Sequence, residues 1–191
     1  MDRLTFDIFE PDGKKFRWTP NTIVLIFGFI PMCLSVFFEK SIAKSELLSN
    51  LITLYAIIGG TVVIGCLIIS FFLRKPLNGV MNGKIEFGTN FFDINNQKFM
   101  LNEINNLDFS FTDYYERRST VRYDLNAKLS QGVNNYITFD DKSDRTYLIY
   151  FRLMSEHSYL ALSPFISQAV KTGKMYLCRA EDLVGRENVV Y

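Results

Sequence analysis

Two long runs of apolar residues without charge dominate the first third of the sequence. Residues 18–38 and 47–73 contain no Asp, Glu, Lys or Arg. A bilayer core of about 30 Å is crossed by about 20 helical residues, so each run is long enough to span a membrane. Neither run has the polar stripe of a helix at the surface of a soluble protein. The pattern predicts a transmembrane helical hairpin, with spans at about residues 20–38 and 49–73.

The segment before the first apolar run has a different pattern. Apolar and polar residues alternate over Leu4–Phe9, Glu10–Gly13 has the composition of a turn, and Lys14–Trp18 follows. This predicts a β-hairpin within residues 1–19. Because a lone hairpin is marginally stable in water, we expect it to pack on the rest of the chain or on a partner.

From about residue 80 the hydrophobic pattern changes to a period of two, which is typical of strands with one buried face. Gly88–Asn90 and Asn95–Asn96 have the composition of turns. The pattern predicts six or seven antiparallel strands joined by short polar turns. They lie at Ile85–Phe87, Phe91–Ile94, Phe99–Leu101, Leu107–Phe111, Thr120–Leu125, Tyr136–Phe139 and Tyr147–Phe151.

A helical pattern follows the strands. It extends from Ser155 to Thr172, and Gly173 is a typical C-terminal stop. The apolar positions of its one face are Tyr159, Leu162, Ile166 and Val170. Ser163-Pro164 offers an alternative start, since Ser caps helices and Pro is favoured in their first turn. In that case residues 157–162 are irregular.

The chain therefore divides into four segments: a β-hairpin segment at 1–19, the helical hairpin at 20–73, a β-rich body with one C-terminal helix at 80–173, and a tail at 174–191. Within the tail, Met175–Cys178 has an extended pattern. It is interpreted either as a strand that adds to a neighbouring sheet edge or as a loosely packed terminus.

Three segments of the body carry a resemblance to a known family. They are Gly83–Phe87, Phe99–Phe109, and Tyr136–Phe139 followed by Tyr147–Leu153. An antiparallel run of about seven strands with one C-terminal amphipathic helix, placed just after membrane helices, resembles the bacterial pleckstrin-homology-like domain, over roughly residues 80–173. The resemblance implies a bent sheet or small barrel plugged by the helix, and a non-enzymatic oligomerisation or interaction module. Eukaryotic relatives often bind phosphoinositides through a basic first loop. Here that loop, Gly88–Asn90, has no Lys or Arg.

The predicted fold class is thus a membrane-anchored α+β protein, in which a two-helix transmembrane hairpin precedes an antiparallel β-sheet or barrel closed by a C-terminal helix. Orientation follows from Lys and Arg near the span ends. The N-terminal segment and the stretch after residue 73 are both basic, although the link has Lys40 and Lys44. This favours a bacterial inner-membrane protein with both termini in the cytoplasm.

Charge and composition argue against several classes of function. The chain has 21 basic and 20 acidic residues, so it lacks the basic excess of nucleic-acid-binding proteins. Its three cysteines form no CxxC pair, and His157 is its one histidine. These residues suggest no zinc or redox site, no cofactor and no small-molecule substrate. Asp140, Asp141 and Asp144 lack the spacing of a calcium loop and are interpreted as a turn. We therefore expect no enzymatic activity.

Two groups of residues are candidates for interaction. Arg117, Arg118 and Arg122 are the densest basic group and follow Tyr114-Tyr115. They are interpreted as a protein-interaction surface, or as a basic loop that contacts lipid head groups, or as a solvated hairpin loop because acidic residues are interleaved. In the second apolar run, small residues recur at a spacing of four and favour close helix packing. They are Ala56, Gly60, Thr61 and Gly65.

The function predicted from these patterns is that of a non-catalytic inner-membrane scaffold or accessory subunit. Its cytoplasmic domain would bind a protein partner or another copy, while membrane lipids surround the helices. The alternative is a sensor of lipid head groups through the basic loop. Transport is disfavoured, since neither apolar run has the intramembrane charge that a conduit usually needs.

Overall fold

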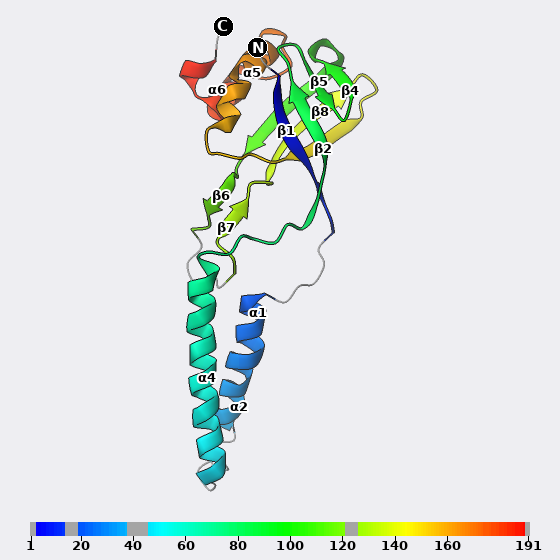
Figure 1. The fold of residues 1–191 in the computed structure, drawn as a ribbon. Coiled ribbons are helices and arrows are strands. Elements are labelled where there is room, and N and C mark those ends of the chain that lie inside the picture. Colours follow the sequence, from blue (N-terminus) through cyan, green and yellow to red (C-terminus); the bar gives the residue numbers. More distant parts are fainter. Residues whose placement is uncertain (1–2, 14–18, 38–45, 121–125, 190–191) are drawn as a thin grey trace. The chain divides into compact units, whose positions relative to one another are not determined.

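The computed structural model describes residues 3–13, 19–37, 46–120 and 126–189. The chain divides into two compact units (Figure 1). The body comprises Met1–Lys14, Pro76–Arg117 and Ser130–Tyr191, and the helical unit comprises Lys15–Lys75 and Arg118–Leu129. Both ends of the chain therefore belong to the body, and the helical unit is inserted into it.

The helical unit has one long apolar helix, α4 (Glu46–Ser70). Its 25 residues make it the one helix among the described residues that is long and apolar enough to cross a membrane. The end of α4 is tied to residues 126–129. The backbone N–H of Lys128 donates to the Ser70 carbonyl (2.9 Å), and the N–H of Leu129 donates to that of Leu73 (3.2 Å). These bonds satisfy carbonyls that a helix end leaves without intrahelical partners.

The prediction of a second span at residues 20–38 is wrong. The first apolar run forms three short segments in succession, which are α1 (Pro20–Val24), the π-helical η1 (Leu25–Phe29) and α2 (Ile30–Phe37). Pro31 has no backbone N–H to donate to the helical ladder, and the i→i+5 pattern of η1 comes directly before it. Hydrophobicity predicted one long α-helix, whereas the π-helical segment divides this run into α-helices of five and eight residues.

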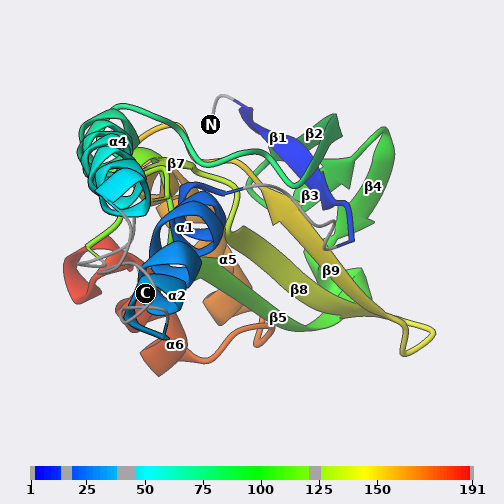
Figure 2. The ribbon, with the colours of Figure 1, turned by 90° about the horizontal axis from the view of Figure 1, so that it is seen from below.

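The body contains an antiparallel seven-stranded sheet in the order β4-β3-β2-β1-β9-β8-β5. Its strands are β1 (Leu4–Pro11), β2 (Gly79–Phe87), β3 (Phe91–Ile94), β4 (Gln97–Met100), β5 (Ile104–Phe111), β8 (Asn135–Asp141) and β9 (Thr146–Phe151). A separate two-stranded sheet pairs β6 (Tyr115–Arg118) with β7 (Leu129–Gln131). Figure 2 shows β9, β8 and β5 side by side. The predicted strand at Thr120–Leu125 lies mostly outside the described residues.

The N-terminal strand lies in the middle of the sheet. β1 pairs with β2 on one side and with β9 on the other. Pro11, its last residue, is the register partner of Gly79, the first residue of β2. The chain thus leaves the sheet and returns to it at adjacent positions, with the helical unit between them. The other half of the predicted N-terminal hairpin, Lys14–Trp18, lies outside the described residues.

The core of the body is built from aromatic rings. Phe87 is fully buried and contacts the rings of Phe6, Phe92, Phe109 and Phe165 at centroid distances between 5.2 and 6.0 Å. Together with Phe87 itself, these rings come from four strands and one helix. Because one side chain contacts so many elements, this cluster holds the sheet and the helix together.

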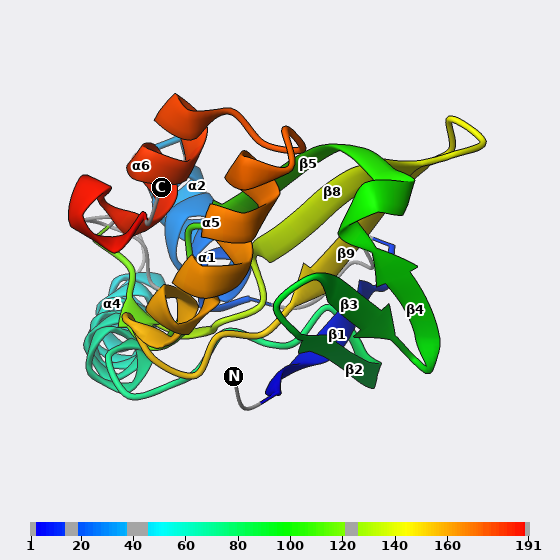
Figure 3. The ribbon, with the colours of Figure 1, turned by 90° about the horizontal axis from the view of Figure 1, so that it is seen from above.

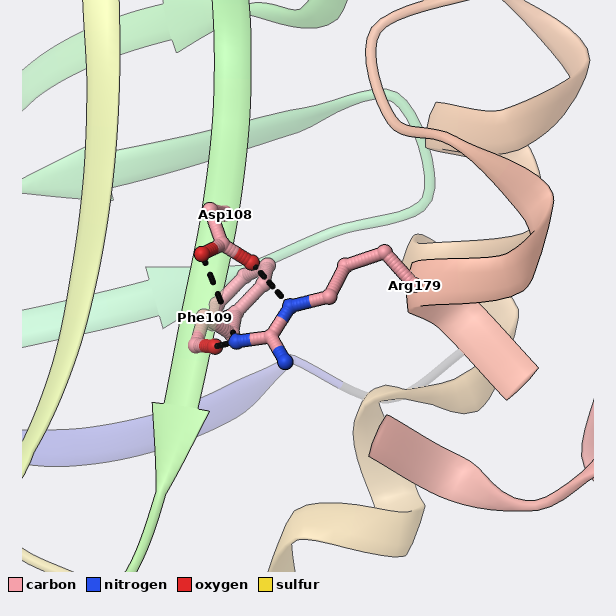
Figure 4. Close-up of polar contacts among 3 residues, drawn as sticks. All are labelled: Asp108, Phe109 and Arg179. Atoms are coloured by element: carbon pink, nitrogen blue, oxygen red, sulfur yellow. Dashed lines mark hydrogen bonds and ion pairs between the residues drawn. The ribbon is translucent and has the colours of Figure 1, made fainter. Parts of the chain in front are cut away.

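The sheet is not a closed barrel, which corrects the predicted fold class. Its edges are β4 and β5, which do not pair with each other. The N–H of Leu107 in β5 donates instead to the Lys174 carbonyl at 3.1 Å. Arg179 donates to the carboxylate of Asp108 (2.7 Å) and to the Phe109 carbonyl (2.7 Å), as Figure 4 shows. The C-terminal segment therefore covers the edge that a barrel would need for closure.

The prediction of a single C-terminal helix and an extended tail is also wrong. The 3₁₀ segment Ser158–Leu162 precedes α5 (Ser163–Lys171), which confirms the alternative start at Ser163. A further helix, α6 (Leu177–Val184), occupies the tail. Figure 3 shows both helices beside the sheet. Fully buried side chains of both, including Phe165, Ile166 and Ala180, join the core, and this burial gives the tail its structure.

Candidate functional site

The predicted tyrosine–arginine group is only partly brought together. The Arg117 guanidinium lies over the ring of Tyr114, at 5.9 Å from its centroid. Tyr115 instead stacks under Arg152 at 4.5 Å, and its N–H donates to the Leu153 carbonyl. Arg117 and Arg118 are exposed, and Arg122 lies outside the described residues. The two tyrosines therefore hold β6 in place more than they offer a free surface.

A buried polar cluster lies where the chain passes from β5 to β6, next to the start of β8. The side-chain oxygen of Asn135 accepts the N–H groups of Thr112 and Asp113, both at 3.0 Å. Its amide nitrogen donates to the Gly132 carbonyl at 2.9 Å. Asn135 is fully buried, and a buried backbone N–H without an acceptor is costly. The cluster thus joins the end of β5 to the start of β8.

Ser130 and Asp113 complete the cluster and are both largely buried. Ser130 Oγ donates to the Asp113 carboxylate and accepts the Gly132 N–H at 3.2 Å. Gly132 has φ = +72°, and a Cβ there would lie 2.4 Å from the Leu153 carbonyl oxygen. Because both hydrogen-bonding roles of the hydroxyl are used, this pair stabilises the fold and does not present a nucleophile.

The acidic residues of the β8–β9 turn act as hydrogen-bond acceptors. Asp140 accepts from Thr146 and Asn106, and Asp141 accepts backbone N–H groups of Ser143 and Arg145. These bonds lower the pKa of both carboxyls, that of Asp140 mainly through Thr146 and that of Asp141 mainly through Arg145. The predicted turn is confirmed. Over the described ranges, no cluster of His, Cys, Asp and Glu could hold a metal ion.

A row of four side chains, three of them aromatic, lies on the sheet face opposite the core; Phe9 is buried (7% exposed), and the other three are half-buried. Register pairs place Met81 beside Phe9, Phe9 beside Tyr150, and Tyr150 beside Tyr136, across four adjacent strands. We call these four residues the outer row. The rings of Tyr136 and Tyr150 meet edge-on, with centroids 5.9 Å apart. Leu148, in the next position of β9 on that face, is 50% exposed.

The two tyrosines of the outer row are half-buried, with the hydroxyl at the end of an apolar ring. Within the described residues, neither hydroxyl has a hydrogen-bond partner. Such side chains suit protein interfaces, because they offer a large apolar area and a polar group together. Alternation in the sequence identified the strands of Tyr136 and Tyr150. Their alignment with Phe9 and Met81 depends on strand order, which the sequence does not reveal.

The small residues of α4 do not act as one group. Ala56 and Gly60 line an apolar groove of about 720 Å³ within the helical unit, together with Gly28 and Met32 of the first apolar run. No side chain lies within 4 Å of a Cβ built at Gly60. Thr61 and Gly65 do not line this groove, and the Thr61 hydroxyl donates to the Ile57 carbonyl of its own helix at 2.9 Å.

Comparison of the chain with protein-family models, with curated proteins and with solved structures finds no match. The resemblance to the pleckstrin-homology-like domain therefore stays a prediction that rests on the sequence pattern.

Proposed function

We propose that the protein is a non-catalytic scaffold or accessory subunit, anchored in the bacterial inner membrane through its helical unit. Its body presents the outer row to a protein partner or to a second copy. The observation that carries this proposal is the half-buried ring pair of Tyr136 and Tyr150 in the outer row, with exposed Leu148 on the same sheet face opposite the core. The contact residues thus lie on β1, β2, β8 and β9 rather than at Tyr114 and Tyr115.

The placement of the body in the cytoplasm is supported by charge. Arg74 and Lys75 lie within five residues of the end of α4, and basic residues near a membrane helix favour the cytoplasmic side. β1 precedes the helical unit and β2 follows it, and the two strands pair in one sheet, so the chain leaves the body and returns to it on the same side of the membrane. Anchoring would then raise the effective concentration of the body toward other proteins at the membrane surface.

The test is purification of the full-length chain from its native membrane in mild detergent, followed by sizing and mass spectrometry. We expect an assembly clearly larger than the 22.2 kDa chain with its detergent. The double variant Y136A/Y150A should shift most of the chain to the monomer. A second polypeptide in the assembly would indicate an accessory subunit, and a single polypeptide a homo-oligomeric scaffold.

A matched control is Tyr176→Ala, since Tyr176 is 84% exposed but lies outside the outer row. This variant should leave the assembly intact. A monomeric wild type, or an assembly that is insensitive to Y136A/Y150A, would contradict the proposal. Leu148 offers an independent check, because a photo-crosslinking amino acid at this exposed position should react with the partner.

A further inference from the structure

The guanidinium of Arg179 is fixed at the edge of the sheet by its hydrogen bonds. Nε donates to Asp108 Oδ1 at 2.7 Å, while Nη2 donates to Asp108 Oδ2 at 3.3 Å and to the Phe109 carbonyl at 2.7 Å (Figure 4). The remaining two N–H groups of a guanidinium are those on Nη1. Within the described residues, Nη1 has no hydrogen bond or ion pair. Because the side chain is 40% exposed, Arg179 presents a pre-oriented pair of donors at the surface.

Three hydroxyl groups lie on the same sheet face, at the end of the outer row. In the register of β5 and β8, Ser110 lies opposite Tyr136, and Asp108 lies opposite Thr138. Since residues two apart in a strand point to the same face, these four side chains share the face of the outer row. Ser110, Tyr136 and Thr138 are half-buried, and none of their hydroxyls has a hydrogen-bond partner in the described parts of the chain.

The charges around Arg179 decide which acceptor suits these donors. The pKa of Arg179 is raised mainly by its hydrogen bond to Asp108, and the charges of Asp108 and Asp182 raise it further. Tyr136 acts in the same direction, so its hydroxyl lies near the guanidinium. Among these groups, one positive charge faces two carboxylates. A further anion would therefore meet repulsion as well as attraction, whereas a neutral oxygen accepts the free N–H groups without that cost.

A partner that covers this end of the outer row has to bring acceptors with it. Covering an N–H or O–H group without giving it a new partner is costly. Main-chain carbonyls are neutral acceptors that every polypeptide has, but inside helices and sheets they are already bonded. An extended segment keeps them available. It also presents apolar side chains, which suit the ring of Tyr150 and the exposed Leu148 next to it.

We propose that the outer row binds an extended, uncharged peptide segment of a protein partner, whose main-chain carbonyls accept hydrogen bonds from Arg179 Nη1 and the Tyr136 hydroxyl. This inference rests on the proposed function and adds the chemistry of the partner at the same surface. Apolar side chains of the segment lie against Tyr150 and Leu148. Arg and Tyr are also the side chains that most often dominate the energy of protein interfaces.

The experiment selects random linear peptides displayed on phage against the full-length chain in mild detergent, with Y136A/Y150A for counter-selection. We expect peptides that are rich in apolar residues and have no excess of Asp and Glu. Because the contacts are with neutral groups, the Kd of synthetic copies should be equal at low and high salt. Y136F should weaken binding about fivefold and R179A about tenfold, since a hydrogen bond to a charged group is the stronger one.

The matched controls are Tyr176→Phe and Arg186→Ala, at exposed positions outside the outer row. Both should leave the Kd unchanged. R179A also removes contacts to β5, so its Tm is compared with that of the wild type. If this variant does not fold, Y136F decides, because it keeps the ring and removes only the hydroxyl.

Acidic peptides whose binding weakens with salt would overturn the inference in favour of a carboxylate ligand. Failure to select any peptide that depends on the outer row would also overturn it, as would binding that Y136F leaves unchanged. In these cases the proposed function still stands if the native assembly depends on Tyr136 and Tyr150. An assembly that is insensitive to Y136A/Y150A would overturn the proposed function itself, which separates the two.

Discussion

The body and the helical unit are both rich in large apolar side chains, but they shield them from water differently. In the body, Phe87 is fully buried among four other rings. In the helical unit, no residue of the apolar window of α4 is buried by the rest of the protein. The difference teaches that a similar hydrophobicity is buried within the protein in one unit and left exposed by the protein in the other. Hydrophobicity stabilises one unit through packing, and in our proposal it stabilises the other through lipid.

Phe87→Ala should give the largest effect on the body. The loss of a buried ring and the cavity that it leaves reduce the unfolding free energy by about 3–5 kcal/mol. Circular dichroism during denaturant titration in detergent measures this change. Phe72→Ala, which removes an exposed ring in the helical unit, should leave the body's transition unchanged. Equal losses would mean that Phe72 is also packed against protein.

Ile58→Lys introduces a charge into the exposed apolar surface of α4 in the helical unit. Ile58 lies at the middle of α4 and is 54% exposed. A Lys at the centre of a membrane helix costs about 3 kcal/mol of insertion free energy. Alkaline extraction of membranes should release a larger fraction of this variant. Val80→Lys, at a position that is 58% exposed in the body, should stay in the membrane fraction like the wild type.

Asn135→Ala tests whether polar contacts support the body as its aromatic core does. The variant leaves the N–H groups of Thr112 and Asp113 without their acceptor. Each buried group without a partner costs about 1–3 kcal/mol, so we expect a loss of roughly 2 kcal/mol or more. Thermal unfolding in detergent measures it. An unchanged Tm would show that water or a rearranged backbone replaces the amide. Thr138→Ala, on the other sheet face of β8, serves as the control.

The smallest effect concerns acid sensitivity, which only the body should show. The pKa values of Asp140 and Asp141 are lowered from 3.8 in the fold. A lowered pKa means that the ionised carboxylates stabilise the folded state above about pH 4. This stability is lost as the pH falls through their folded-state pKa values. D140N/D141N should therefore flatten the dependence of Tm on pH below about 4, as thermal unfolding at a series of pH values measures.

Local patterns predicted the local structure well. Alternation identified the strands around Phe87, Phe109 and Phe139, and Asn95-Asn96 forms a turn in which both residues have positive φ. The charge-free run identified α4. The errors arose where contacts between residues far apart in the sequence determine the structure. The edge of β5 is covered by Arg179, about 70 residues later in the chain. The local sequence pattern therefore could not predict that the sheet stays open or that the tail forms a helix.

The candidate site was harder to predict than the fold. Tyr136 and Tyr150 lie in strands that the sequence predicted, but Phe9 belongs to the N-terminal segment, which was predicted as a hairpin separate from the body's strands. Tyr114 and Tyr115 were expected at an interaction surface, and their contacts with Arg117 and Arg152 give them structural roles. The sequence shows which residues alternate, whereas only the strand order shows which of them become neighbours.

The central place of β1 has a consequence for biosynthesis. Ile8 leaves the ribosome well before its register partner Phe151, which follows it by about 140 residues of chain. At about 5–20 residues per second, roughly 7 to 30 s separate the two. Until β2 has been made the nascent strand lacks both neighbours, and until β9 has been made it lacks one of them, while α4 is synthesised before β2. We therefore expect β1 to stay unpaired until these later strands have been made. A bulky N-terminal fusion should then slow folding more than a C-terminal one.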